Sequence, residues 1–352
     1  MNRQCKATSV WNCAVMVMVV AAVALGLQGP ASAQCSHWEP VGGNVGSRWV
    51  IDTGSGPEMY GYVIVSGSGH SAIARWNGAS WTYLVDPAQG WFNEQINGLC
   101  SYDDGTGLAL YASGRFTEMD VNHQIIRYVS KWSGTQWTFI GPPIQFPVNQ
   151  VGPMAVFDDG SGPALYVAGF FNTAGLSDNI VRLKGTVWES VGGGLPSFTN
   201  GLCAFDDGSG NALFTSYVEF SGSSYVGKLC KWTAGGWTTV LSGFTWNGGS
   251  PTSPWGLAVY DHGMGLRLFM AGIFDMIGGV VAPGYAEWDG STLFPVSGAP
   301  HVPAAGSGVN LALHDDGTGP ALYVQTGYSL IDRWDGHTWS VVGAGGENPQ
   351  SF

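Results

Sequence analysis

Pairs of aspartates are the residues of this chain whose type and spacing could bind a metal ion. They occur as Asp103-Asp104, Asp158-Asp159, Asp206-Asp207 and Asp315-Asp316, each followed by glycine. Carboxylate oxygens are the ligands that Ca²⁺ prefers. The same composition also forms hairpin turns, in which the carboxylate accepts backbone N–H groups and glycine takes the left-handed positions. Two matching segments lack the second acid (Asp52-Thr53 and Asp261-His262), so we expect turns and predict neither a metal nor a cofactor.

No other group that could catalyse a reaction follows a known catalytic pattern. The 7 histidines show no H-E-x-x-H spacing, and the chain contains no G-x-S-x-G motif. Two carboxylates suited to glycoside hydrolysis could be picked by chance from any set of 25 acidic residues. We therefore assign no catalytic residue.

Aromatic residues in several loops could instead bind a ligand. The candidate ligand-binding residues are Trp91, Phe92, Asn93, Glu94, Trp246, Asn247 and Trp255. A flat ring offers a stacking surface to a sugar, and nearby amides and carboxylates can hydrogen-bond its hydroxyl groups. In the alternative interpretation, these rings fold over the ends of the sheets and seal the core.

The loops connect copies of a repeated unit of about 50 residues. In Val151–Gly194, four short apolar runs are separated by Gly, Asp and Ser, which predicts an antiparallel meander of four strands. Six copies align at turns beginning at Asp52, Asp103, Asp158, Asp206, Asp261 and Asp315. Most copies also carry the pattern W-x-G-x-x-W, or a close variant of it, between the third and fourth strands. Repeated four-stranded units are typical of the blades of a β-propeller, which is an all-β fold.

We predict six four-stranded antiparallel blades, with seven as the alternative. Their expected bounds are 47–84, 98–141, 152–194, 201–241, 256–297 and 308–343. The segment Trp38–Gly42 matches the fourth strands of the repeat, as in Trp188–Gly192. An extra N-terminal strand over residues 38–42 is therefore expected to help close the ring.

A basic residue stands in the third strand of five copies, at Arg75, Lys131, Arg182, Lys231 and Arg333. The fifth copy has Glu287 at this position. We expect the basic side chains to pair with turn carboxylates of a neighbouring blade.

The repeat resembles a known type of protein. The stretch DDGSGPALYVAG, followed by a third strand of the form I-x-R-W, resembles the secreted β-propeller repeats of planctomycete-type bacteria, and more distantly kelch and WD repeats. The resemblance covers residues 38–343 and implies the architecture. It implies no activity, because propellers carry unrelated functions.

The N-terminus and the charge indicate where the protein works. Arg3 and Lys6, an apolar run over Ala14–Leu27 and the small residues Ala31-Ser32-Ala33 predict a signal peptide over residues 1–33. The propeller is then expected over residues 34–344, with a tail over 345–352. The net charge of −12 offers no basic surface for nucleic acid. We expect a monomer that is secreted, periplasmic or on the cell surface, without membrane insertion after cleavage.

The meander predicts two unlike faces. The turns between strands 1 and 2 and between strands 3 and 4 share one face, and they carry the repeated Asp-Gly and Trp-x-Gly sequences. The loops between strands 2 and 3 and the crossovers between copies share the other face, and they differ in every copy. We therefore predict a non-catalytic binding or scaffolding module for an extracellular polysaccharide or a surface protein. The alternative is a propeller hydrolase or lyase acting on extracellular polysaccharide.

Overall fold

The computed structural model describes residues 45–64, 71–76, 80–85, 92, 94–116, 128–140, 144–233, 236–303, 309–315, 318–326 and 330–344. Within these ranges every regular element is a β-strand, so the expected all-β class is confirmed. No helix that could cross a membrane occurs in the same residues.

The strands form antiparallel meanders, and five of the sheets contain four strands each. Sheet I contains β1 (Val45–Asp52), β2 (Pro57–Ile64), β3 (Ser71–Trp76) and β4 (Trp81–Tyr83). Sheet II contains β5 (Ile96–Asp103), β6 (Leu108–Gly114), β7 (Val129–Trp132) and β8 (Trp137–Phe139). Sheet III contains β9 (Ile144–Asp158), β10 (Pro163–Thr173), β11 (Ile180–Lys184) and β12 (Val187–Ser190). Sheet V contains β18 (Gly256–Asp261), β19 (Leu266–Ala271), β22 (Tyr285–Trp288) and β23 (Leu293–Pro295). Sheet VI contains β24 (Val309–Asp315), β25 (Pro320–Thr326), β26 (Leu330–Trp334) and β27 (Trp339–Ala344).

Sheet IV departs from the four-stranded pattern. Its strands are β13 (Thr199–Asp206), β14 (Asn211–Ser221), β15 (Ser224–Thr233), β16 (Gly236–Trp246), β17 (Ser250–Pro251), β20 (Met276–Ile277) and β21 (Val280–Val281). The last two strands belong to a loop of sheet V and pair with the end of β16. The prediction of six or seven four-stranded blades is therefore wrong. The propeller has five four-stranded blades, and the meander of sheet IV is enlarged to seven strands.

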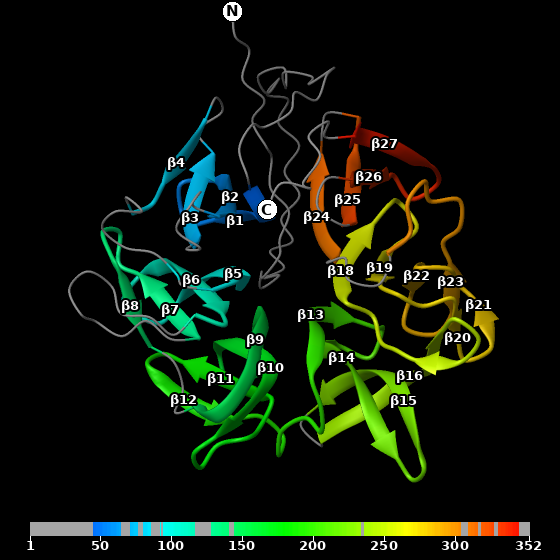
Figure 1. Cartoon of the computed structure of the whole chain (residues 1–352), viewed down its shortest axis with the longest axis horizontal. Helices are drawn as coiled ribbons and strands as arrows, with labels where there is room; N and C mark the ends of the chain where they lie inside the picture. The colour runs from blue at the N-terminus through cyan, green and yellow to red at the C-terminus, as the bar shows by residue number, and fades with distance from the viewer. Residues whose placement is uncertain are drawn as a thin grey trace, which may run out of the picture.

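The sheets are arranged around a ring with their first strands innermost (Figure 1). Each first strand contacts the first strand of the next sheet, in the order β1, β5, β9, β13, β18 and β24, and β24 contacts β1. Both faces of a first strand are consequently covered, which explains why segments such as Leu202–Phe205 of β13 are apolar on both sides. The proposed closing strand over residues 38–42 lies outside the described residues.

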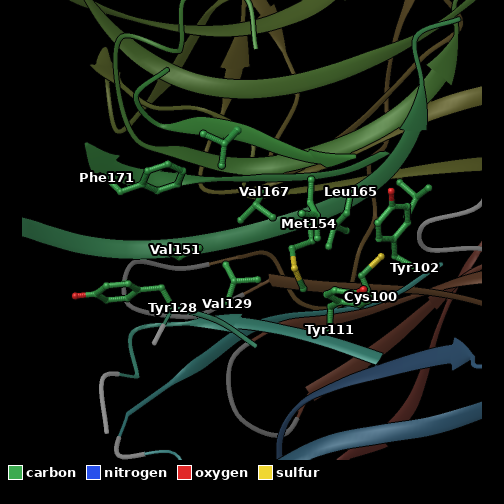
Figure 2. Close-up of a cluster of buried hydrophobic side chains, with 13 residues drawn as sticks. Cys100, Tyr102, Tyr111, Tyr128, Val129, Val151, Met154, Leu165, Val167 and Phe171 are labelled. Atoms are coloured by element: carbon green, nitrogen blue, oxygen red, sulfur yellow. The ribbon is translucent and has the colours of Figure 1, made fainter. Parts of the chain in front are cut away.

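Apolar layers between neighbouring sheets hold the ring together. Figure 2 shows one such layer, in which Cys100 and Tyr111 of sheet II face Met154, Leu165 and Val167 of sheet III. All five side chains are buried. Burying apolar surface stabilises by about 25 cal/mol per Å², so this contact between sheets, which a single meander could not make, supplies much of the stability.

The repeated tryptophans are cross-strand partners on either side of the turn between the third and fourth strands. The pairs are Trp76–Trp81, Trp132–Trp137, Trp232–Trp237 and Trp334–Trp339, with ring centroids 5.1 to 5.5 Å apart. Each pair is directly opposed in its ladder. The spacing W-x-G-x-x-W therefore arises because the two aromatic rings must flank a tight turn.

The turns of adjacent sheets interlock on one face of the ring. The Tyr102 hydroxyl of sheet II donates to the carbonyl of Pro163 and accepts the N–H of Gly185, both in sheet III. The Tyr260 hydroxyl of sheet V donates in the same way to the carbonyl of Pro320 in sheet VI. The repeated turn sequences therefore join the sheets.

Candidate functional site

The aspartate turns on this face are built from internal hydrogen bonds. The first aspartate accepts the N–H groups two and four residues ahead through one oxygen, as Asp158 does from Gly160 (2.8 Å) and Gly162 (2.9 Å). Asp52, Asp103, Asp206 and Asp261 make the same two bonds. The donating glycines have positive φ, at +94° and +104° in this example. These contacts support the interpretation of the aspartates as turn formers.

The second aspartate pairs with the basic residue of the third strand in its own sheet. Lys131 Nζ lies 2.6 Å from Asp104 Oδ2, and Lys231 Nζ lies 2.6 Å from Asp207 Oδ1. Arg182 pairs with Asp159 in the same arrangement. The expectation that these ion pairs link neighbouring blades is wrong, because a third strand and the first turn of the same meander lie two strands apart on the same side of the sheet.

The ion pair with Lys131 controls the titration of Asp104. Burial alone would raise the pKa of this carboxyl group, but hydrogen bonds from Lys131, Thr106 and Tyr111 outweigh it and lower the pKa to about 2. The pKa of an aspartate in an unfolded chain is about 3.9. The ionised carboxylate therefore stabilises the fold fully above about pH 4, and this contribution is lost as the pH falls towards about 2.

Replacing Lys131 by methionine should lower the free energy of unfolding by about 1–2 kcal/mol at pH 7, because Asp104 loses its charged donor. The loss of stability between about pH 4 and pH 2 should be shallower than in the wild type. Urea unfolding over this pH range measures both effects. Arg75→Met is the matched control, because Arg75 holds the same position in sheet I and its pair with Glu58 (3.2 Å) is more exposed. Equal effects of the two substitutions would contradict this account.

On the opposite face, the structure separates the predicted ligand-binding residues into two groups. Trp91 and Asn93 lie outside the described residues. Phe92 is buried, with its ring 4.6 Å from Phe116 and 5.4 Å from Trp137. Phe92 therefore contributes to the core between sheets I and II. Glu94 is half exposed and pairs with Arg115 at 3.3 Å.

The second group lies at the end of sheet IV. Trp246 is the last residue of β16, and its side chain is 39% exposed. Asn247 follows in the left-handed conformation (φ 50°), and its N–H donates to Asp275 Oδ2 at 2.9 Å. Trp255 is half buried, and its backbone N–H donates to the carbonyl of Ala271. The carboxylate of Asp275, from the loop after β19, thus fixes the turn that follows Trp246.

The register places two further aromatic residues on the same side of sheet IV as Trp246. Gly227 of β15 is directly opposite Phe244 of β16, and Tyr225 and Trp246 each lie two residues further out. Phe220 is directly opposite Tyr225 across the β14–β15 hairpin. Because side chains two residues apart or directly opposed share a face of the sheet, Phe220, Tyr225 and Trp246 point to one side.

We refer to Phe220, Tyr225, Trp246, Asn247 and Asp275 as the outer corner of sheet IV. Phe220 and Tyr225 are 61% and 60% exposed, and their ring centroids are 5.0 Å apart. Strand β17 lies between the ring pair Phe220–Tyr225 and Trp246, because it pairs with β16 and contacts β15. Figure 1 shows the β14–β15 hairpin projecting from the ring beside β16.

Sequence reasoning missed three of these residues. Phe220 and Tyr225 flank Ser-Gly-Ser-Ser, a turn signal that could have indicated a hairpin with exposed aromatic ends. Asp275 carries no local signal, because it reaches Asn247 only through the pairing of β20 with β16.

Comparison with known proteins adds the following. No protein-family model matches the chain, and no curated protein matches it. Among solved structures, the chain is similar to the lectin of Aleuria aurantia, solved as a mutant in complex with Fucalpha1-6GlcNAc. The sequences are 16% identical, the match covers 85% of this chain and 79% of the lectin, and the TM-score is 0.35. At this identity and TM-score the likeness shows no function for this chain.

Proposed function

We propose that the protein is a secreted propeller that binds extracellular glycans at the outer corner of sheet IV. The observation that carries this proposal is the set of three exposed aromatic rings on one side of a projecting sheet end. Covering an exposed aromatic side chain with a ligand removes its apolar surface from water and is favourable, so such rings are typical anchors of a binding surface.

The polar groups at this corner favour a sugar over an apolar partner. The exposed amide of Asn247 can both donate to and accept from hydroxyl groups. The carboxylate of Asp275 fixes the backbone at Asn247, so less conformational entropy of the turn is lost when a ligand binds there. A ring for stacking beside an exposed amide suits a pyranose, which has an apolar face and hydroxyl groups at its rim.

The location of the protein rests on the sequence. The predicted signal peptide over residues 1–33 would export the chain, and extracellular polysaccharides would then be its accessible partners. Trp91 and Asn93 remain predicted ligand-binding residues on the basis of the sequence. A surface protein is the second class of partner that the same aromatic corner would fit.

Replacing Trp246 or Tyr225 by alanine should each weaken binding on a polysaccharide and oligosaccharide array by up to about tenfold, because each stacked ring contributes up to about 1.5 kcal/mol. The array signal of the purified wild type and its variants is the measurement. Phe139→Ala is the matched control, because Phe139 is also 39% exposed but lies in β8, away from the corner. Loss of binding in this control, or a wild type that binds no glycan, would contradict the proposal.

A further inference from the structure

Asp332 breaks the repeat at a position where the fold has no use for a charge. It immediately precedes the basic residue of the third strand in sheet VI. The equivalent residues of the other sheets are Ala74, Ser130, Val181, Cys230 and Ala286. All of these are buried and uncharged, and Asp332 is likewise fully buried, at 0% exposure. Burying a carboxylate costs several kcal/mol, so a scaffold role does not explain it.

The buried carboxylate holds one histidine by its ring and its backbone. His301 lies on the crossover between β23 and β24, and its Nδ1 is 3.0 Å from Asp332 Oδ1. The His301 backbone N–H donates to Asp332 Oδ2 at 3.1 Å. The Tyr285 hydroxyl donates to the carbonyl of His301 at 2.9 Å. Three contacts therefore hold this loop residue in one position.

This arrangement selects one tautomer of the neutral imidazole ring. An ionised carboxylate only accepts hydrogen bonds, so Nδ1 carries the proton and Nε2 presents a lone pair. The His301 side chain is 32% exposed, and no hydrogen bond to Nε2 is formed within the part of the chain that the structure describes. An oriented imidazole with an available Nε2 has the geometry of a general base.

We propose that His301 and Asp332 form a general-base dyad that hydrolyses carboxylic esters, with His301 as the catalytic residue and Asp332 as the positioning residue. Nε2 removes a proton from water while the water oxygen bonds to the ester carbonyl carbon. The tetrahedral intermediate then breaks its bond to the alcohol oxygen, which takes the proton back from Nε2. One ester and one water give one carboxylic acid and one alcohol.

The surroundings of His301 favour esters over glycosides. Glycoside hydrolysis needs two carboxyl groups that flank the bond to be broken. Asp332 is fully buried and contacts Nδ1, on the opposite side of the ring from Nε2, so it cannot reach a substrate at Nε2. A single base that activates water is sufficient for an ester, whose alcohol leaves readily. The site is separate from the outer corner and does not depend on glycan binding there.

Hydrolysis of p-nitrophenyl acetate by the full-length protein tests the dyad. The wild type should exceed buffer, and His301→Ala should lower the rate of the protein-dependent reaction by about 10²-fold. His337→Ala is the matched control, because His337 is an exposed histidine in the turn between β26 and β27, and it should keep the wild-type rate. A wild type no faster than buffer, or a His301→Ala variant as fast as the wild type, would overturn the proposal.

Asp332→Ser separates positioning from folding. Serine is the residue of sheet II at this position, so the scaffold accommodates it. We expect a folded variant that loses at least about tenfold in rate, because general-base catalysis needs the oriented ring. Nitrogen-15 NMR of the imidazole should show the proton of His301 on Nδ1 in the wild type and a mixture of tautomers in Asp332→Ser. A wild type protonated on Nε2, or an unchanged tautomer and rate in the variant, would contradict the role of Asp332.

Discussion

Replacing Glu287 by alanine should lower the free energy of unfolding by about 3–5 kcal/mol, the cost of removing one partner of a buried ion pair. Glu287 occupies the third-strand position that is basic in the other sheets, and its side chain is 4% exposed. Its carboxylate accepts hydrogen bonds from Arg267 Nη1 and from Trp334 Nε1 of sheet VI, both at 2.9 Å. His262 Nε2 lies 3.3 Å away. Alanine would leave a buried guanidinium and an indole N–H without an acceptor between sheets V and VI.

Two further variants distinguish this effect from ordinary loss of a charge. Glu189→Ala removes a half-exposed partner of Arg182, which keeps its pair with Asp159, so it should cost less than about 1 kcal/mol. The double substitution Glu287→Met with Arg267→Met should cost less than Glu287→Ala alone, because no buried charge is left. Urea unfolding gives all three values. A Glu287→Ala variant no less stable than Glu189→Ala would contradict the burial of this ion pair.

Replacing Gly290 by alanine should destabilise the protein by about 3–5 kcal/mol, because backbone strain and a steric clash add. Gly290 has φ +102°, and a Cβ atom there would lie 2.2 Å from the backbone carbonyl oxygen of Asp207. Asp207 belongs to the first turn of sheet IV, whereas Gly290 lies in the turn between β22 and β23 of sheet V. The clash would therefore force the two sheets apart at their interlocking turns.

Gly134→Ala is the matched control for this contact. Gly134 lies in the equivalent turn of sheet II with φ +96°, and a Cβ atom there would meet nothing within 4 Å. Its substitution should cost only the backbone strain, about 1–2 kcal/mol. Thermal or urea unfolding measures the difference, which reports the packing of one sheet on the next. Equal costs at the two glycines would mean that the turns do not interlock.

The sequence was sufficient to predict the four-stranded meanders and their turns. Each needs only local information, such as an aspartate that accepts two N–H groups or two tryptophans opposed across a turn. The sequence was not sufficient for sheet IV. Residues 242–254 lie between the predicted bounds of the fourth and fifth blades, so the sequence predicts a crossover there, but β16 continues to Trp246 past Gly243, whose φ is +78°. This extension is stabilised by pairing with β20, which lies about 30 residues further along the chain. Such long-range pairing has no local signal.

The candidate site was predictable to a similar extent. The sequence identifies Trp246 and Asn247 because an aromatic residue is unusual in a predicted exposed loop and an amide stands beside it. The sequence could not distinguish Phe92 from Trp246, because exposure depends on which sheets cover each ring. Asp332 was not predicted as a site residue because an acid in a strand carries no local signal. Its significance depends on the strand register, which aligns it with five buried, uncharged residues.

The most direct test of glycan binding at the outer corner is NMR of the wild type during titration with an oligosaccharide that binds on the array. The indole N–H resonance of Trp246, assigned by its absence in Trp246→Phe, and the side-chain amide of Asn247 should shift and saturate with the same dissociation constant. The indole resonance of Trp188, which donates to the carbonyl of Ile140 in another part of the ring, should stay unchanged. If the sugar binds while Trp246 and Asn247 do not shift, the glycan site lies elsewhere and the proposed role of the outer corner is wrong.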